Sequence, residues 1–497
     1  DTWLPRFATM KNQPTKRPFA NDNTKYPQLV SDQPETNFAI LNYETTGKVS
    51  DVWRVIQMNG SAEYEILKGL KFKGMLGYYY AYNELDNQEF TYELYGYNEQ
   101  TDNYYVTNRM SNPYRERNRE KVEDQFSNFQ LNFDRKFGKH AVVAVAGFEA
   151  SQRKRPRMWI HSTPVSNAMD LIRLKEIQEF NDDGNRTEAR MGYLGRVNYS
   201  YSDKYLVELI ARWDGSWKFR PDNRWGFFPS ASLGWRVSEE NFWKENKIGE
   251  IVTNLKLRGS YGEVGDDAVS NYSAFDYLPG YNYNSGGAVI DGNWVVGTST
   301  RGLPNQTLSW MTAKILDIGV DLGFLNNRLN VQFDYFRRVR DGIPESRYDV
   351  LIPNEVGFSL PKENLRSDMH KGFDASIMWT DHINDFNYSV GGNITYSRFW
   401  DWEQYKPRFS NSWDEYRNSI WHRVGYVNWG YEAVGRFDSW EQIANYPIDN
   451  DRKGNRTVVP GDIMYKDQNN DGVINYLDER PIGYRVDSTP TLNFGIN

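Results

Sequence analysis

The sequence has 497 residues, more than a single soluble core usually holds, and 15% of them are aromatic. A formal net charge of -7 argues against nucleic acid as a partner, because phosphate contacts need a basic face. The absence of cysteine excludes disulfides, thiolate metal sites and cysteine nucleophiles, and no apolar run approaches the roughly 18–20 residues of a transmembrane helix.

The aromatic content favours β-structure but leaves two classes open. Tyr, Phe and Trp number 34, 26 and 17, and such residues suit a pleated, half-buried surface. Tyr and Trp also gather at membrane interfaces, where the ring is buried and the polar tip stays wet. Composition alone therefore permits either a membrane barrel or a soluble β-protein such as a carbohydrate enzyme.

Segments of alternating apolar and polar residues, most of them about 9–13 residues long, run through the chain, and we predict that each is a β-strand. They cover residues 54–64, 70–83, 129–134, 141–150, 191–201, 205–215, 227–237, 254–263, 316–322, 329–335, 372–380 and 385–397. A thirteenth begins near Pro490 and is cut off at Asn497.

The clearest hairpin covers residues 316–335 and turns at residues 326–328. Its first arm alternates Leu316, Ile318, Val320 and Leu322 with Asp317, Gly319 and Asp321, and its second alternates Leu329, Val331, Phe333 and Tyr335 with Asn330, Gln332 and Asp334. Globular strands average only about 5–6 residues, whereas a tilted arm of about ten crosses a bilayer. Length therefore favours a membrane barrel here.

Connections between these segments alternate in length. Short ones lie at 65–69, 138–140, 202–204, 326–328 and 381–384, with a medium one at 238–253 on the same side. Long ones cover 84–124, 151–190, 264–312, 339–371 and 399–489, and the connection at 216–225 is shorter. Short periplasmic turns and long extracellular loops are typical of outer-membrane barrels. The pattern predicts an all-β, transmembrane antiparallel β-barrel: residues 54–497 form strands, turns and loops, and residues 1–53 form an extracellular loop segment.

Several blocks resemble, in the expected order, the barrel of SusC/RagA-type TonB-linked transporters. They comprise Gly195-Arg196-Val197-Asn198-Tyr199, Arg212-Trp213-Asp214-Gly215-Ser216, Asn223-Arg224-Trp225-Gly226-Phe227-Phe228-Pro229-Ser230, Leu255-Lys256-Leu257-Arg258-Gly259-Ser260-Tyr261-Gly262, Asp317-Ile318-Gly319-Val320-Asp321-Leu322, Lys371-Gly372-Phe373-Asp374 and Pro460-Gly461-Asp462-Ile463. The resemblance covers residues 54–497. No plug domain, TonB-contacting segment or final strands are recognisable, so we expect the sequence to be part of a longer protein.

The resemblance implies part of a 22-stranded barrel in the outer membrane of a Gram-negative, Bacteroides-like bacterium. It implies TonB-dependent import of glycans or peptides with a SusD-like lipoprotein, contact with TonB through the missing N-terminal region, contact with outer-membrane lipid, and a dimer of transporter–lipoprotein pairs. It implies no enzymatic activity. Three alternatives stay open: a siderophore-type TonB-dependent receptor, a soluble glycan-active enzyme, and a purely structural surface-layer or adhesion barrel.

One motif predicts a metal site, in the segment 467–478. Asp467, Asn469, Asp471, Asn475 and Asp478 offer side-chain oxygens at the EF-hand spacing, and Val473 would contribute its carbonyl. Asp478 stands where an EF-hand has a bidentate Glu, so Ca²⁺ would bind more weakly. The alternative is a plain Asx/Gly turn.

Other clusters are assigned no catalytic role, and the substrate-binding residues cannot be named from the sequence. Aromatic residues between 400 and 431 suit sugar or peptide side chains, but self-packing of a large loop explains them more simply. The basic run 153–157 suits lipopolysaccharide phosphates or an acidic partner, although a solvated loop is the simpler reading. The five histidines show no metal-ligand spacing.

Overall fold

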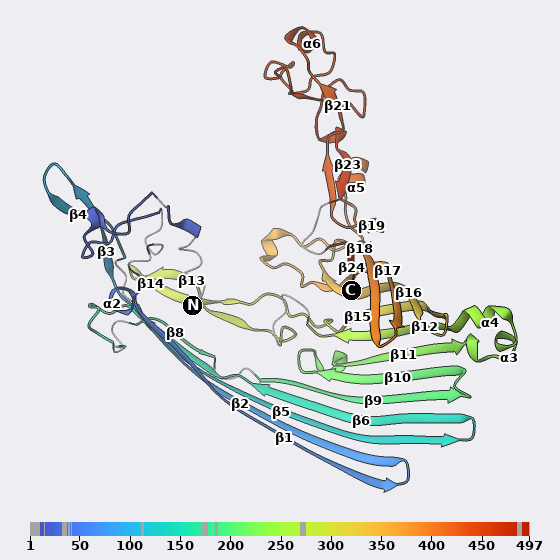
Figure 1. The fold of residues 1–497 in the computed structure, drawn as a ribbon. Helices are drawn as coiled ribbons and strands as arrows, with labels where there is room; N and C mark the ends of the chain where they lie inside the picture. The colour runs from blue at the N-terminus through green and yellow to red at the C-terminus, as the bar shows by residue number, and fades with distance from the viewer. Residues whose placement is uncertain are drawn as a thin grey trace. The chain divides into compact units, whose positions relative to one another are not determined.

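The structure, a computed structural model, describes residues 10–13, 15–31, 37, 40, 42–110, 114–170, 172, 177–183, 187–268, 275–484 and 490–496 (Figure 1). Long antiparallel strands dominate it. They are β1 (Gly47–Leu67), β2 (Leu70–Glu89), β5 (Tyr114–Phe137), β6 (His140–Lys154), β9 (Thr187–Tyr201), β10 (Tyr205–Ser216), β11 (Trp225–Arg236), β12 (Val252–Asp266), β15 (Met311–Phe324), β16 (Leu329–Glu345), β17 (Glu363–Ile383) and β18 (Phe386–Glu403).

These strands pair with their neighbours in chain order within one 16-stranded sheet. β19 (Arg423–Val424) and β24 (Leu492–Ile496) both pair with β18, while β7 (Arg157–Ser162) pairs with β5 and β8 (Ile177–Asp183). Every segment predicted from alternation lies within one of these strands, apart from single terminal residues, and β24 is the predicted thirteenth. The predicted all-β, antiparallel fold is confirmed.

The strands are longer than predicted. β5 has 24 residues and β17 has 21, and the extra length lies toward the long connections. The added part of β5, Tyr114–Lys121, is charged on both faces, so alternation cannot reveal it. Backbone hydrogen bonding between strands continues through this segment, but polar residues on both faces remove the hydrophobic alternation. β1 likewise begins at Gly47, before the predicted boundary at residue 54.

The long connections contain secondary structure of their own. They hold the hairpins β3 (Tyr92–Asn98)/β4 (Asn103–Met110) and β13 (Tyr281–Ile290)/β14 (Asn293–Thr300), and the pairs β20 (Val427–Gly430)/β23 (Arg480–Tyr484) and β21 (Ala433–Arg436)/β22 (Ile463–Tyr465). The helices are α2 (Tyr43–Thr46), α3 (Asn241–Lys244), α4 (Lys247–Ile251), α5 (Ser412–Asn418), α6 (Trp440–Ala444), η1 (Ala20–Asp22), η5 (Pro221–Asn223), η6 (Val237–Glu239), η7 (Asn354–Val356) and η8 (Tyr476–Asp478).

The predicted short turns close adjacent strands tightly. Gly69 has φ +82 between β1 and β2, a conformation that glycine adopts at little cost. Between β9 and β10, Ser202 and Asp203 both have positive φ (52 and 58), as a two-residue hairpin turn requires. Turn chemistry therefore fixes the register at this end of the strands.

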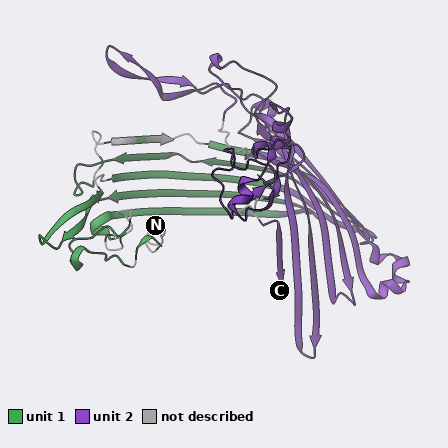
Figure 2. Ribbon diagram, turned by 90° about the horizontal axis from the view of Figure 1, so that it is seen from above, with its two compact units in different colours: residues 1–63, 73–129, 149–190 green, residues 64–72, 130–148, 191–497 purple. Residues whose placement is uncertain are grey.

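Contacts divide the chain into two compact units (Figure 2). One comprises residues 1–63, 73–129 and 149–190, and includes the β3/β4 hairpin. The other comprises residues 64–72, 130–148 and 191–497, and includes β9–β18 and the loop segment after them. The functional features described below lie within the second unit unless stated.

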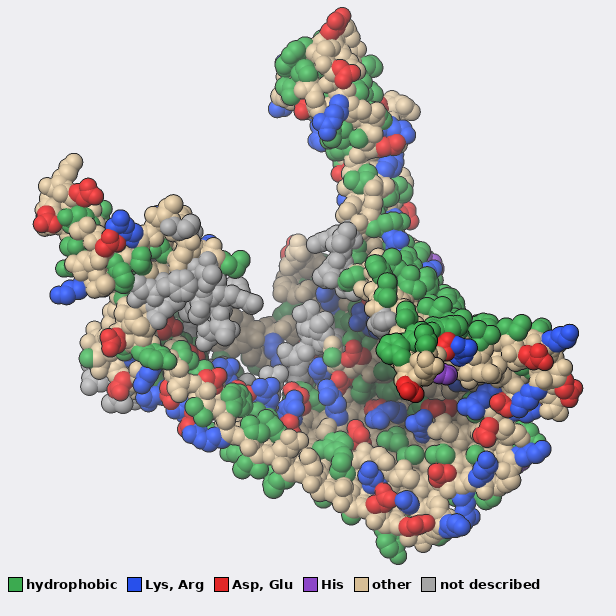
Figure 3. All heavy atoms as spheres, viewed as in Figure 1, with side chains coloured by type: hydrophobic (Ala, Val, Ile, Leu, Met, Phe, Trp, Pro, Cys, Tyr) green, Lys and Arg blue, Asp and Glu red, His purple; other side chains and the backbone are tan. Residues whose placement is uncertain are grey.

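Buried apolar residues are few, and large apolar side chains are mostly exposed on the strands. One small cluster joins Phe219, Leu308 and Met311, and a second joins Phe437, Ile443 and Val458. By contrast Leu233 is 63% exposed and Ile318 is 54% exposed, and apolar side chains gather visibly over parts of the surface (Figure 3). Among the described residues, no helix is both long enough and apolar enough to cross a membrane.

Candidate luminal site and outer loops

The pairing register gives the sheet one apolar and one polar face. Across β15 and β16, Ile318 lies opposite Tyr335, and Val320 lies opposite Phe333. The intervening positions place Gly319 opposite Asp334 and Asp321 opposite Gln332. Since side chains alternate between faces, apolar rows share one face and polar rows the other. In a barrel the first faces lipid and the second faces the lumen.

Arg258 of β12 is the centre of an ion-pair network on the polar face. Its Nε lies 3.1 Å from Asp321, its Nη2 donates to Asp334 at 2.6 Å, and its Nη1 lies 3.6 Å from Asp317. Lys256 adds a second cation, 3.7 Å from Asp321. Three carboxylates from two neighbouring strands thus converge on one guanidinium, whose five donors in a planar fork suit this role.

Gly319 makes this convergence possible. It lies opposite both Arg258 and Asp334 in the register. A Cβ at this position would overlap the Asp334 carboxylate and would lie 2.8 Å from Arg258 Cζ. Any larger residue would therefore push the two charged groups apart.

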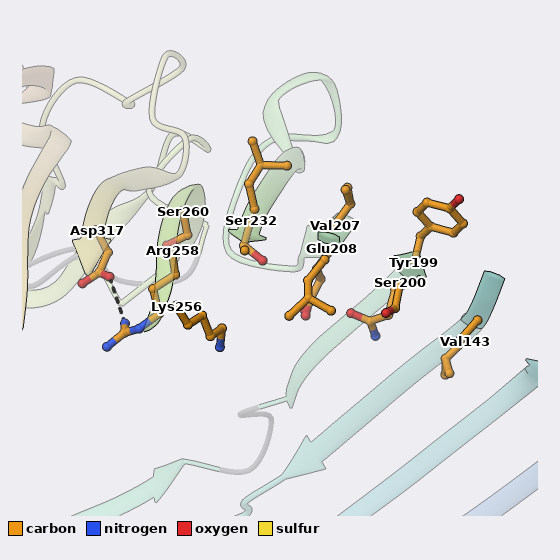
Figure 4. A pocket seen from close by; sticks show the side chains of 16 residues that line it. Val143, Tyr199, Ser200, Val207, Glu208, Ser232, Lys256, Arg258, Ser260 and Asp317 are labelled. Carbon is orange, nitrogen blue, oxygen red and sulfur yellow. Dashed lines mark ion pairs between the residues drawn. The ribbon is translucent and has the colours of Figure 1, made fainter. Parts of the chain in front are cut away.

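A shallow pocket of about 460 Å³ adjoins this network. It is lined from β6, β9, β10, β11, β12 and β15, and its polar residues include Ser200, Glu208, Ser232, Arg258 and Asp317 (Figure 4). The figure shows the ion pair of Arg258 and Asp317 at one end of the row and Tyr199 near the other. Serine hydroxyls and charged groups spread along several strands can bind polar solutes, but they hold no catalytic constellation.

Further ion pairs continue along the same face. Arg196 pairs with Glu208 at 3.1 Å, and Arg212 with Asp214 at 2.9 Å. Nearer the long connections, Arg340 pairs with Asp368, whose side chain is only 5% exposed. The polar face is thus hydrophilic along its length and largely neutralised by paired charges.

The aromatic cluster between residues 400 and 431 packs mainly on itself and on cations. Trp402 stacks on His422 with ring centroids 4.1 Å apart, and Tyr416 meets Trp429 edge-on at 5.2 Å. Arg417 lies 4.6 Å from the Trp429 ring. These contacts support the self-packing interpretation. Trp421, which is 52% exposed, presents an aromatic face to solvent beside His422.

The predicted calcium loop is ordered by its own side chains. Asp467 accepts hydrogen bonds from the amides of Asn470 and Gly472, both at 2.7 Å. The Asn469 amide donates to Asp471 at 2.9 Å, and with the Val473 amide it lowers the pKa of Asp471. Asp467, Asn469 and Asp471 therefore lie together, as the motif predicts.

Asp478, the last of the predicted ligands, is held by backbone hydrogen bonds at the end of the loop. It is completely buried and accepts hydrogen bonds from the amides of Gln468 at 2.9 Å and Asn475 at 2.8 Å. Together with Asn475, it forms a capping box at η8. The Val473 carbonyl accepts from the Asn475 side chain at 3.1 Å. Within the described part of the chain no group of three or more His, Asp or Glu has metal-binding geometry, and calcium binding stays a prediction.

A second acidic turn, at residues 449–457, was missed by motif reasoning. Asp451 accepts from the Thr457 hydroxyl at 2.6 Å and from the amides of Lys453 and Asn455 at 2.8 and 2.9 Å. The bond from Thr457 contributes most to holding the pKa of Asp451 well below its usual range. Asp449 joins this turn to the calcium-like loop, because its amide donates to the Gly472 carbonyl at 2.8 Å. The spacing of Asp451, Lys453 and Asn455 was the sequence signal from which this turn could have been predicted.

The basic run at residues 153–157, in the first unit, has internal partners. Arg153 binds both oxygens of Asp124 at 2.7 Å, and Arg155 pairs with Glu120 at 2.6 Å. These charges are neutralised within the unit, which favours the simpler structural reading over a phosphate site.

A wide antiparallel sheet with an apolar face, a polar ion-paired face, short turns and structured long loops defines an outer-membrane β-barrel. Residues 6–497 match the family described as TonB dependent receptor-like, beta-barrel. The chain belongs to that family of outer-membrane barrels. It is therefore part of an outer-membrane barrel of a Bacteroides-like bacterium.

Curated relatives are named as TonB-dependent receptors. The chain is 26% identical over 493 residues to TonB-dependent receptor P3 of Formosa agariphila, covering 96% of this chain and 45% of that protein. It is 32% identical over 295 residues to TonB-dependent receptor SusC of Bacteroides thetaiotaomicron, covering 56% of this chain and 28% of SusC. The chain thus spans less than half the length of these relatives.

The solved structure of the RagAB peptide transporter has the same fold. The two superpose with a TM-score of 0.64 at 18% identity, over 90% of this chain and 46% of that one. The resemblance to SusC/RagA-type transporters predicted from sequence blocks is confirmed by these relatives.

Proposed function

We propose that the protein containing this chain imports oligomeric nutrients, glycans or peptides, across the outer membrane in a TonB-dependent manner. The main support is a strand set of this family whose luminal face is largely polar and carries several ion pairs. A polar wall permits passage of hydrated solutes, whereas an apolar face holds the wall in lipid. We expect no chemistry on the substrate, because the relatives are named as receptors and transporters.

A SusD-like surface lipoprotein is the proposed partner. Two relatives support it, the TonB-dependent receptor SusC and the RagAB peptide transporter. The long connections on one side of the sheet provide a structured surface for such a partner. Contact with TonB and pairing of two transporter–lipoprotein complexes belong to the same proposal.

The partner is tested by extracting the full-length tagged protein from native outer membranes in mild detergent and identifying what accompanies it by mass spectrometry. A near-stoichiometric SusD-like lipoprotein is the expected result, with an untagged strain as the control. Recovery of the barrel alone would favour a siderophore-type receptor instead.

A further inference from the structure

Three cations form one row across β16, β17 and β18, on the apolar face of the sheet. Arg337 lies directly opposite Lys371, and Lys371 lies directly opposite Arg398. Neighbouring strands are only about 4.8 Å apart, so the three charges are adjacent. Like charges directly opposite one another destabilise a sheet, and a compensating anion would remove that cost.

The three cations contact aromatic rings and a thioether. Arg337 lies 5.0 Å from the Trp402 ring and donates to Met369 Sδ at 3.2 Å. Lys371 Nζ is 4.2 Å from the Trp400 ring. Arg398 is 3.6 Å from the Tyr484 ring. Within the described ranges no carboxylate forms an ion pair with any of them.

Other cations on this face have carboxylate partners. Lys314 of β15 pairs with Asp341 at 2.7 Å, and Arg328, at the short turn before β16, pairs with Asp381. The unpaired row is thus a local exception, and it lies beyond the apolar and aromatic rows on the side of the long connections, followed by the row Val339/Met369/Trp400.

Successive rows along these strands follow the profile of a bilayer. The apolar rows are Leu329/Trp379/Val390, Val331/Ile377/Gly392 and Phe333/Ala375/Ile394, followed by the aromatic row Tyr335/Phe373/Tyr396 and then the cations. Phe373 stacks on Tyr396 with centroids 5.7 Å apart. Arg337 lies roughly 27 Å along the strand from Leu329, which at a strand tilt of about 35–45° is roughly 19–22 Å along the membrane normal and approaches an apolar band about 25 Å tall. The cations therefore stand close to the headgroup level.

We propose that the row Arg337–Lys371–Arg398 binds the phosphate of an outer-leaflet glycolipid. A phosphate group carries up to two negative charges and pairs bidentately with guanidinium. The acyl chains of the same lipid would lie against the apolar rows below, and the aromatic row would pack at the sugar level. This binding is separate from import and does not depend on it.

The test uses the full-length, delipidated protein in detergent and measures binding of lipid A, a phosphorylated glycolipid, by native mass spectrometry. Each single substitution, Arg337→Gln, Lys371→Gln or Arg398→Gln, should weaken binding about fivefold, because one cation facing a phosphate contributes about that factor to the affinity. The triple variant should bind about a hundredfold more weakly than the native protein. Arg338→Gln is the matched control: it is the next residue of β16 and points to the opposite face, so binding should be unchanged.

Two further comparisons, of ligands and of variants, test the proposal. The native protein should bind dephosphorylated lipid A as weakly as the triple variant binds lipid A. The Lys371→Arg variant, which keeps the positive charge, should retain binding. Heat-modifiability on gels verifies that the variants are folded. The proposal is overturned if the triple variant binds lipid A normally, or if inorganic phosphate alone binds as tightly as the lipid. Loss of a co-purifying acidic protein without loss of lipid A would make the row a protein interface and overturn it too.

Discussion

Gly319 shows how a single residue sets the luminal charge network. Its missing Cβ leaves room for Arg258 and Asp334 to meet, so Gly319→Ala should force them apart. We expect a loss of about 1–3 kcal/mol in the free energy of unfolding, as for other overpacked sites. Urea unfolding in detergent measures it. Gly259→Ala is the control, because the nearest atom to a Cβ there is 3.8 Å away. Equal stability of the two variants would contradict the network's geometry.

Asp451 predicts how the outer loop responds to pH. Its folded pKa lies far below the unfolded value, mainly through the Thr457 hydroxyl. The stabilisation is therefore fully present above an unfolded pKa of about 3.9 and is lost only as the pH falls further. Amide protection at residues 453–457, measured by hydrogen exchange and corrected for intrinsic rate, should be constant from about pH 8 to pH 5.

The matched change is Asp451→Asn, which removes the charge but keeps the size. It should reduce this protection across the same pH range. If amide protection in the native protein declined between about pH 8 and pH 5, the Asp451 carboxylate would titrate in that range. That result would contradict a lowered pKa for Asp451.

Calcium binding is tested by replacing Asp467 and Asp471 with Ala. If the loop holds an ion, calcium that co-purifies with the native protein should be absent from this variant when measured by elemental mass spectrometry. Asp438→Ala, in a neighbouring loop, is the control. Calcium retained by the double variant would show that the ion is bound elsewhere. A weak site is expected because both oxygens of Asp478 already accept bonds from the Gln468 and Asn475 amides, and an Asp stands where an EF-hand has a bidentate Glu.

At the scale of strands, hydrophobic alternation located all the long strands because a bilayer on one side and water on the other impose a period of two. It failed at the strand ends near the long connections, where β5 carries charges on both faces.

The candidate site was less predictable from the sequence than the strands. The residues of the Arg258 network are visible in the sequence, but their convergence depends on the register between β12, β15 and β16. The Asp467 turn was predictable because all its bonds are local, whereas the capping role of Asp478 depends on η8.

The two faces of the sheet make opposite predictions for the same substitution. Val320→Arg places a charge in the middle of the lipid-facing rows and should destabilise the folded barrel by about 2–4 kcal/mol. Gln332→Arg, on the luminal face of the neighbouring strand, should have little effect because water solvates it there. Folding in lipid vesicles, followed by heat-modifiability across a urea series, compares them. Similar losses for both variants would contradict the assignment of faces.

At the scale of the whole molecule, the chain belongs to the TonB dependent receptor-like barrel family, and the polar luminal face agrees with solute passage. The ion pairs keep that face hydrophilic without a large net charge, which suits solutes that differ in charge. The row at Arg337, Lys371 and Arg398 would in turn fix the barrel's height in the outer leaflet.

Energy-dependent import is the central claim, and uptake in the native bacterium tests it most directly. Fluorescent oligosaccharide and peptide pools of defined length would be offered to the parent strain, a strain lacking the full gene, and a strain depleted of TonB. The account predicts that entry of one pool falls sharply in both altered strains and returns on complementation of the deletion. Entry of both pools at the parental rate in the deletion strain and in the TonB-depleted strain would contradict it.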